Sequence, residues 1–410
     1  MKKIICLISL SVISISILAQ TVQETMALAF LYNSTNGANW TKKTNWLSSR
    51  PVSTWYGITI KYNRVTSLDL SKNNLSGMIP PEIGLLTNLT HLNLEGNYRI
   101  MGDIPQEIGL LTNLIMLNLS RIGFSGSIPK EIGNLKSIDS LIMSYNNLSG
   151  SIPIEIGNLT SLDYLDLRNN NFTKTIPSAI GNLTKLLVLD LSFNKLVGPI
   201  PPEIGKLTKL EELDLSNFYL PNYTDTNRLS GSIPTEIGLL PDLVRLDLSG
   251  NQLTGSIPEE IFNLTLLNNL DLSYNRLSGN IPEGIGNTNI YDLNLSYNQL
   301  TGPIPAEIGG MTNLFNLDLS YNQITGSIPQ GIGNLYLYVL DLSNNRLTGS
   351  IPPEIGNITN LNSIDLGNNL LSGPVPPEIG KLTNLIYLDL TNNNLTGPVP
   401  EHIRIRTIPR

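Results

Sequence analysis

Residues that could carry acid–base, nucleophilic or metal chemistry are scarce in this 410-residue chain. Its two histidines, His91 and His402, lie near opposite ends, so no histidine-paired metal site or serine–histidine pair is expected. The single cysteine, Cys6, falls inside an apolar N-terminal run, which leaves the mature chain without a thiol nucleophile or a disulfide. We therefore predict no enzymatic activity, no cofactor and no metal.

The most numerous potential ligands are aspartates that recur at one site, between the two leucines of an L-x-L segment. This row consists of Asp69, Asp166, Asp190, Asp214, Asp247, Asp271, Asp318, Asp341, Asp365 and Asp389. On adjacent strands such carboxylates would lie about 5 Å apart and could bind cations weakly. The interpretation that we favour is local: each aspartate hydrogen-bonds to the serine two positions later.

Aromatic residues concentrate in two rows. Tyr274, Tyr297 and Tyr321 take the last outward site of three consecutive strands, and Tyr291, Phe315 and Tyr338 take the first outward site. Between the rows, a polar floor of Asp271, Asn294, Asp318 and Asp341 is expected. Because tyrosine is enriched at binding hot spots, we predict that the six rings bind a partner. The alternative is that they stack on one another and stiffen the sheet.

These residues are positioned by an internal repeat. The pattern L-x-x-L-x-L-x-x-N-x-L-x-G-x-I-P begins at Val65, Leu89, Leu114, Ile138, Leu162, Leu186, Leu210, Leu243, Leu267, Ile290, Leu314, Leu337, Leu361 and Leu385. A period of this size is typical of a solenoid, in which each unit buries its apolar face only against its neighbours. The fourteen units are numbered here in chain order.

The ninth unit shows how one repeat is expected to fold. Leu270 and Leu272 point inward from a short strand while Asp271 faces outward. Asn275 ends the strand, and its amide can satisfy backbone groups that a tight turn leaves unpaired. Pro282 is expected to stop any helix or strand ladder from running through the second half of the unit.

Three segments carry a family resemblance: Gly77-Met78-Ile79-Pro80, Gly126-Ser127-Ile128-Pro129, and Leu-Thr-Asn-Leu at 86–89. They resemble the consensus of plant-type leucine-rich-repeat proteins, as found in receptor-kinase ectodomains and polygalacturonase-inhibiting proteins. The resemblance covers residues 65–400. It implies an α/β repeat solenoid: a curved stack with a parallel β-sheet on its concave face and a small helical N-terminal cap. Because this class serves many partners, it implies binding in general and no particular ligand.

The ends of the chain differ from the repeats. Residues 1–19 are predicted to be a signal peptide, with Lys2 and Lys3 before the apolar run 4–18. Residues 20–64 are predicted to cap the stack: Thr21-x-x-Glu24 forms a capping box, and Met26, Phe30 and Leu31 of the following helix are available for burial. Three tryptophans, Trp40, Trp46 and Trp55, are expected to cover the open end of the first repeat. Residues 401–410 form a C-terminal tail.

The seventh repeat carries nine extra residues, 218–226, between Leu215 and Asn227. Receptor ectodomains of the resembling class often have longer insertions in comparable places, and some of those bind ligand. We nevertheless interpret this segment as a tolerated surface loop, because loops accept insertions at little cost.

Charge and hydropathy narrow the function. A formal charge of −7 and a pI near 5.0 give no support for nucleic-acid binding, which requires a basic surface, so we expect no nucleic-acid partner. No apolar stretch after the signal is long enough to span a membrane. We expect a secreted or cell-surface protein that recognises an extracellular protein partner through its concave face. The alternative is that the aromatic residues bind a carbohydrate or cell-wall polymer.

Overall fold

The computed structural model describes residues 22–217 and 226–398. The predicted signal peptide, residues 218–225 of the insertion and the C-terminal tail lie outside these residues. The chain divides into two compact units, one up to Val188 and one from Leu189 onward. Within the described ranges, the search for a helix both long enough and apolar enough to cross a membrane finds none.

The N-terminal unit contains a sheet in the order β1-β2-β4-β6-β8-β10. Only β1 and β2 are antiparallel, and the later strands are parallel to one another. The sheet strands are β1 (Ile58–Lys61), β2 (Arg64–Asp69), β4 (His91–Asn93), β6 (Met116–Asn118), β8 (Ser140–Ile142) and β10 (Tyr164–Asp166). Shorter outer strands are β3 (Ser76–Gly77), β5 (Arg99–Gly102), β7 (Gly123–Phe124), β9 (Ser149–Gly150) and β11 (Asn171–Phe172).

Short 3₁₀ helices connect the strands of this unit, and one α-helix precedes them. The α-helix covers residues 22–34 of the described chain. The 3₁₀ helices are η1 (Gly37–Asn39), η2 (Val52–Thr54), η3 (Pro81–Leu85), η4 (Gln106–Leu110), η5 (Lys130–Asn134), η6 (Ile154–Asn158) and η7 (Ser178–Asn182). Strand β12 (Val188–Asp190) contains the boundary between the two units.

The α-helix packs on the first repeat through a face that the sequence predicted only in part. Leu31 is fully buried, as predicted, and so is Leu28, whereas Met26 and Phe30, which were also predicted to be available for burial, are 51% and 45% exposed. Glu24 joins the helix to the first repeat: its carboxylate accepts hydrogen bonds from the Arg64 guanidinium at 2.7 and 2.9 Å and from the Val65 N–H at 3.2 Å. Thr21, the other residue of the predicted capping box, lies outside the described residues. This buried ion pair ties the helix to β2.

The three tryptophans form the core of the cap. Trp40, Trp46 and Trp55 are at most 7% exposed, and their rings contact one another with centroids 4.8 to 5.1 Å apart. Each indole N–H donates to a backbone carbonyl, those of Trp40 and Trp46 at 2.9 Å. They are thus buried against one another, and their expected role in covering the open end of the first repeat stays a prediction.

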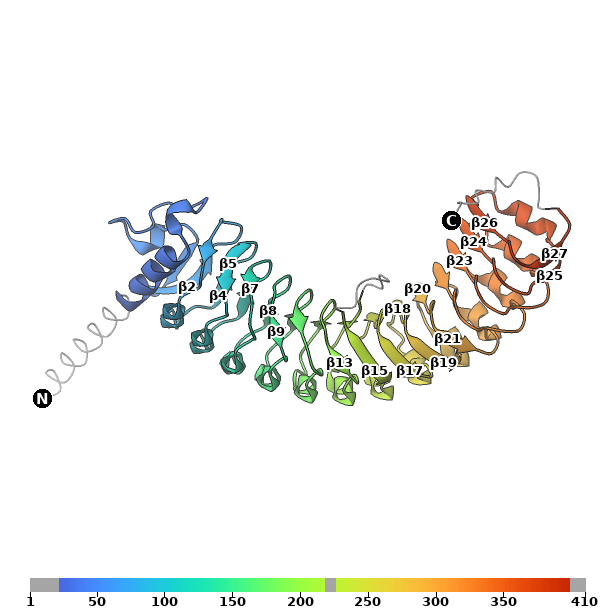
Figure 1. Ribbon diagram of the computed structural model, residues 1–410, viewed down its shortest axis with the longest axis horizontal. Helices are drawn as coiled ribbons and strands as arrows, with labels where there is room; N and C mark the ends of the chain where they lie inside the picture. Colours follow the sequence, from blue (N-terminus) through green and yellow to red (C-terminus); the bar gives the residue numbers. More distant parts are fainter. Residues whose placement is uncertain (1–21, 218–225, 399–410) are drawn as a thin grey trace, which may run out of the picture. The chain divides into compact units, whose positions relative to one another are not determined.

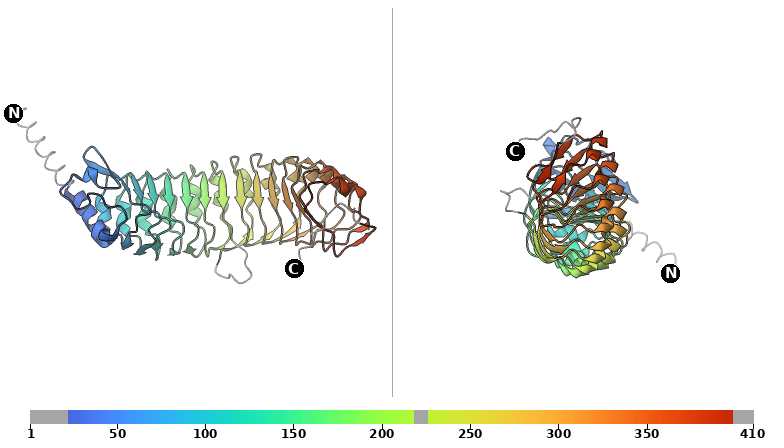
Figure 2. Two further views of the ribbon diagram at one scale, coloured as in Figure 1. Left: turned by 90° about the horizontal axis from the view of Figure 1, so that it is seen from above. Right: turned by 90° about the vertical axis from the view of Figure 1, so that its right-hand side faces the viewer.

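The C-terminal unit repeats the same architecture. Its main sheet runs β14-β16-β18-β20-β22-β23-β24-β26, all parallel. These strands are β14 (Glu212–Asp214), β16 (Arg245–Asp247), β18 (Asn269–Asp271), β20 (Asp292–Asn294), β22 (Asn316–Asp318), β23 (Val339–Asp341), β24 (Ser363–Asp365) and β26 (Tyr387–Asp389). Figure 1 shows them on the inner side of the bend within this unit, and Figure 2 shows them running side by side in one direction.

The remaining elements of this unit form its other layers. Outer strands are β13 (Val197–Gly198), β15 (Arg228–Ser232), β17 (Gln252–Gly255), β19 (Arg276–Asn280), β21 (Gln299–Thr301), β25 (Ser372–Pro374) and β27 (Asn394–Thr396). The 3₁₀ helices are η8 (Pro202–Lys206), η9 (Thr235–Leu239), η10 (Glu259–Asn263), η11 (Glu283–Asn287), η12 (Ala306–Gly310), η13 (Gln330–Asn334), η14 (Pro353–Asn357) and η15 (Pro377–Lys381). The fold class expected from the sequence is confirmed: a repeat solenoid with a parallel sheet and an N-terminal helix.

The inward leucines and the asparagine hold adjacent repeats together. Leu270 is paired in register with Leu246 and Leu293 of the neighbouring strands and is 1% exposed. Asn275 donates to the carbonyls of Leu248 and Leu272 and accepts from the Leu253 N–H at 3.0 Å, as expected. Pro282 does not stop helix formation, because η11 begins at the next residue; proline at this position lacks only an N–H that the first turn leaves unpaired.

Candidate functional site

Tyr274, Tyr297 and Tyr321 form a stack that we call the turn column. Ring centroids are 4.1 Å apart in both pairs, with planes inclined by 10° and 11°. The sequence had predicted that these three residues lie on strands, but they do not. The strands end three residues earlier, and the tyrosines occupy the following turn with φ of 52° to 53°. In this left-handed conformation each tyrosine N–H donates to the serine carbonyl of the next repeat.

Tyr291, Phe315 and Tyr338 form a second stack, the strand-start column. Each of these residues immediately precedes a strand of the main sheet. Their rings are 4.9 and 5.1 Å apart and nearly parallel, with interplanar angles of 6° and 2°. Backbone bonds set this spacing: the Phe315 N–H donates to Tyr291 O at 2.8 Å and the Tyr338 N–H to Phe315 O at 2.7 Å. The six predicted residues are therefore brought together as two columns of three, and the stacking considered as an alternative occurs in both.

The polar floor lies on the strands of these repeats. Asp271, Asn294, Asp318 and Asp341 are half-buried and paired in register on adjacent strands. Each accepts a hydrogen bond from the N–H of the serine two residues later, at 2.9 to 3.1 Å. The local aspartate–serine interaction predicted from sequence is thus confirmed. Within residues 22–217 and 226–398, the second carboxylate oxygens of Asp318 and Asp341 accept no hydrogen bond.

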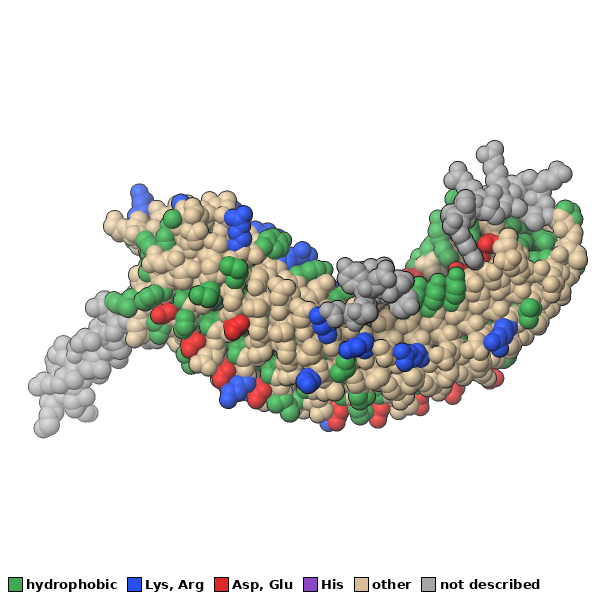
Figure 3. Space-filling view, viewed as in Figure 1, with side chains coloured by type: hydrophobic (Ala, Val, Ile, Leu, Met, Phe, Trp, Pro, Cys, Tyr) green, Lys and Arg blue, Asp and Glu red, His purple; other side chains and the backbone are tan. Residues whose placement is uncertain are grey.

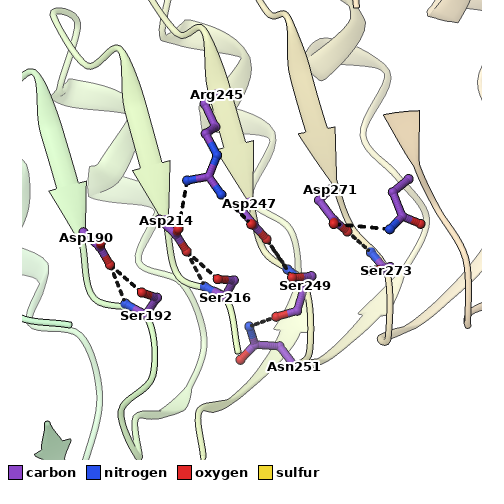
Figure 4. Close-up of polar contacts among 11 residues, drawn as sticks. Asp190, Ser192, Asp214, Ser216, Arg245, Asp247, Ser249, Asn251, Asp271 and Ser273 are labelled. Atoms are coloured by element: carbon purple, nitrogen blue, oxygen red, sulfur yellow. Dashed lines mark hydrogen bonds and ion pairs between the residues drawn. The ribbon is translucent and has the colours of Figure 1, made fainter. Parts of the chain in front are cut away.

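Sequence reasoning missed an arginine that bridges two carboxylates of the recurring aspartate row, which we call the aspartate ladder, on the N-terminal side of the columns. Arg245 begins β16, and its guanidinium lies 2.9 Å from Asp214 Oδ2 and 2.8 Å from Asp247 Oδ2 (Figure 4). Its two partners are far apart in sequence, and only the parallel register of β14 and β16 aligns them. A search of outward positions on adjacent repeats for opposite charges would have found it.

Burial raises the pKa of Asp247, Asp271, Asp341 and Asp365. It raises the pKa of Asp341 to about 6, and repulsion from Asp318 adds to the shift. Burial likewise raises the pKa of Asp247 to about 6, with repulsion from Asp214 and Asp271, although Arg245 lies beside it. Desolvation therefore outweighs the ion pair at Asp247. The Tyr387 hydroxyl donates to Asp365 Oδ2 at 3.3 Å, and burial raises the pKa of Asp365 as well.

The two histidines and the acidic side chains were also considered as catalytic or metal-binding groups. His91 is exposed, and its Nδ1 lies 2.9 Å from the Thr90 hydroxyl; His402 is outside the described residues. Over residues 22–217 and 226–398, no three side chains among His, Cys, Asp and Glu are placed to hold a metal ion.

Family models match a large part of the chain. Residues 141–228 match the model described as "Leucine-rich repeat region" and residues 336–395 match "Leucine rich repeat". A third model, "Leucine Rich Repeat", matches residues 64–86, 242–264, 266–288, 289–311 and 313–335. The matches thus include the repeats that hold both aromatic columns.

Known proteins of similar sequence and structure come from plants and from a bacterium. A probable inactive leucine-rich repeat receptor-like protein kinase of Arabidopsis thaliana is 47% identical over 57 residues, which cover 13% of this chain and 8% of that protein. The plant peptide hormone receptor RGFR1, solved in complex with RGF2, is 38% identical with a TM-score of 0.64, covering 81% of this chain and 60% of that one.

A leucine-rich-repeat protein of Leptospira interrogans is also 38% identical, with a TM-score of 0.65 over 81% of this chain and 79% of that chain. The chain spans less than a tenth of the curated plant relative and about three fifths of RGFR1. Its repeat pattern, its parallel sheets and these matches agree. The chain therefore belongs to the leucine-rich-repeat family, in the plant-type class that receptor ectodomains represent.

Proposed function

We propose that this protein binds a protein or peptide partner outside the cell, through the sheet face that carries the turn column and the strand-start column. The observation that carries the proposal is the pair of aromatic stacks on four consecutive repeats. Tyr291, Tyr321 and Tyr338 are each 40% to 42% exposed, so the columns offer apolar surface to a partner. The half-buried floor between them offers hydrogen-bond acceptors.

The conformation of the turn column supports a role beyond packing. Asn344, Asn368 and Asn392 take the same site in repeats twelve to fourteen, with φ of 54° to 55°, and Gly250 takes it in repeat eight. Asparagine and glycine adopt this conformation with less strain than tyrosine. Three successive tyrosines at a site where the fold accepts asparagine therefore favour a functional choice.

The similar proteins support binding as the activity. RGFR1 is described as a peptide hormone receptor and was solved with RGF2, which is a precedent for ligand recognition by this architecture. The predicted signal peptide at residues 1–19 supports export, and secretion or display at the cell surface is part of the proposal. The scarcity of histidine and the absence of a thiol from the predicted mature chain support recognition over catalysis.

Carbohydrate binding, the alternative from the sequence, has less support. Sugars stack on the open faces of aromatic rings, but the middle rings, Tyr297 and Phe315, have neighbouring rings on both faces. The columns therefore present mainly ring edges to solvent, which suit the irregular side chains of a protein better than flat sugar rings.

The test is selection from a displayed random-peptide library on the immobilised full chain. The variant Tyr274→Asn/Tyr297→Asn/Tyr321→Asn replaces the turn column by the residue that repeats twelve to fourteen already use. Tyr336→Asn, at a 58% exposed tyrosine outside both columns, is the matched control. We expect selected peptides to lose binding to the triple variant and to keep it with the control. Peptides that bind both variants as well as the parent, while only the melting temperature falls, would show that the rings are structural.

A further inference from the structure

Two arginines of this chain show what the ladder and the turn site accept. Arg245 bridges the carboxylates of Asp214 and Asp247 at 2.9 and 2.8 Å. In the N-terminal unit, Arg121 lies 4.2 Å from the ring centroid of Tyr145, which occupies the turn site of its repeat. A guanidinium is planar and forked, so it can stack on a ring and pair with carboxylates at the same time. Both modes are therefore used within the protein itself.

The same acceptors recur in repeats eleven to fourteen without an arginine. We call Asp318, Asp341, Asp365 and Asp389 the acidic strip; they are aligned on β22, β23, β24 and β26. None of them forms an ion pair with a residue in the described ranges. These four strands and the residues just before them contain no lysine or arginine. The acidic strip is thus a row of half-buried carboxylates that no lysine or arginine of the described residues neutralises.

Two ring faces border the strip. Tyr321 and Tyr338 end the turn column and the strand-start column on the C-terminal side, where the next repeat has Asn344 and Asn362 at the equivalent sites. On this side of each column, Tyr321 and Tyr338 have no further ring against their outer face among the described residues. In Figure 3, acidic and hydrophobic side chains lie together along the inner side of this unit, while its visible basic side chains lie on the flank.

We infer that the partner presents arginine side chains to this surface, stacked on Tyr321 and Tyr338 and paired with the acidic strip. The occupant is an arginine-bearing segment of another protein, and this identification rests on the proposed binding function. Lysine fits less well, because an ammonium group pairs with carboxylates but offers no plane to stack and no fork to bridge two of them. The geometry at Arg245 is the template for the bridge.

The binding test uses a defined probe, the peptide Arg-Gly-Arg-Gly-Arg, with Lys-Gly-Lys-Gly-Lys and the citrulline analogue as comparisons. Calorimetry with the full chain at pH 7.5 is expected to give affinities in the order arginine, lysine, citrulline. Asp341→Asn/Asp365→Asn should weaken the arginine peptide by roughly tenfold, and Tyr321→Asn by a few fold. Asp139→Asn, which removes an exposed carboxylate elsewhere, is the matched control and should change little.

Two results would overturn the inference. One is equal binding of the arginine and lysine peptides, which would show only attraction to a negatively charged protein. The other is arginine binding that the strip variants leave unchanged. Failure of the binding function itself is distinguishable: display peptides that need the turn column but show no arginine enrichment would keep the proposed function and reject this partner class.

Discussion

Protonation of Asp341, a half-buried aspartate of the polar floor, should make the folded protein more stable in mild acid. Its pKa rises from an ordinary value of 3.8 to about 6 because burial opposes its charge. Between these values the folded chain holds a proton that the unfolded chain has lost. Stability is therefore greatest below the unfolded pKa and is lost as pH rises through the folded pKa. The full shift corresponds to about 3 kcal/mol, which solvent around a half-buried side chain reduces to about 1–2 kcal/mol.

Asp341→Asn removes the charge and keeps the fold's local bonds. Asn294 occupies the same site in repeat ten and accepts from the Ser296 N–H at 3.1 Å, so asparagine can replace the carboxylate there. The assay is the denaturation midpoint in urea at pH 5 and pH 8, with Asp139→Asn as the control. At pH 8 we expect the free energy of unfolding of the variant to exceed that of the parent by about 1–2 kcal/mol. Between pH 8 and pH 5 the free energy of unfolding should rise less in the variant than in the parent. A parent protein equally stable at both pH values, or a variant with an undiminished pH response, would refute this reasoning.

Three further predictions concern the free energy of unfolding and are measured by urea denaturation of the variants named. Leu246→Ala, at a fully buried position, should cost about 2–5 kcal/mol, whereas Asp247→Ala on the outward side should cost much less; equal losses would mean that the register is wrong. Asn298→Ala should cost about 2–4 kcal/mol, because the Leu277 N–H and three carbonyls lose their partner. Arg64→Ala should cost about 3–5 kcal/mol by leaving the buried Glu24 unpaired, and Glu24→Gln/Arg64→Met should recover much of that loss.

The repeat pattern predicted much of the fold because each position has one environment in every unit. The sequence correctly placed Leu270 in the core, Asp271 in the polar floor and the Asn275 amide on backbone groups of its own and the adjacent repeat. The same holds in neighbouring repeats. Prediction also failed where a segment occurs only once. The N-terminal helix presents Met26 and Phe30 to solvent, since its phase depends on how Glu24 meets Arg64 and Val65, contacts that no local pattern records.

The candidate site was also predicted only in part from the sequence. Equal spacing placed Tyr274, Tyr297 and Tyr321 in one column, and the sequence indicated that the rings could stack. It did not reveal that they sit in a left-handed turn, because the length of each strand depends on where the backbone bonds to the next repeat stop. The bridge from Arg245 to Asp214 was missed because two repeats must be aligned in space before their charges can be compared. The partner-binding role of the rings stays a prediction.

At the turn site the backbone hydrogen bonds hold the fold, and the side chain contributes to the surface. The surface can therefore differ between repeats while the fold stays the same. The left-handed turn is fixed by bonds from its own N–H, such as Tyr297 N–H to Ser320 O at 2.9 Å, and Asn344 makes the equivalent bond to Gly367 O at 2.9 Å. The side chain there is free to vary at the cost of some local strain. The site of the outward aspartates also accepts different side chains, because Asn294 and Asp318 each accept a hydrogen bond from the N–H of the serine two residues later. Runs of tyrosine and aspartate can therefore accumulate on adjacent repeats as a surface, whereas the leucines beneath them cannot change without loss of packing.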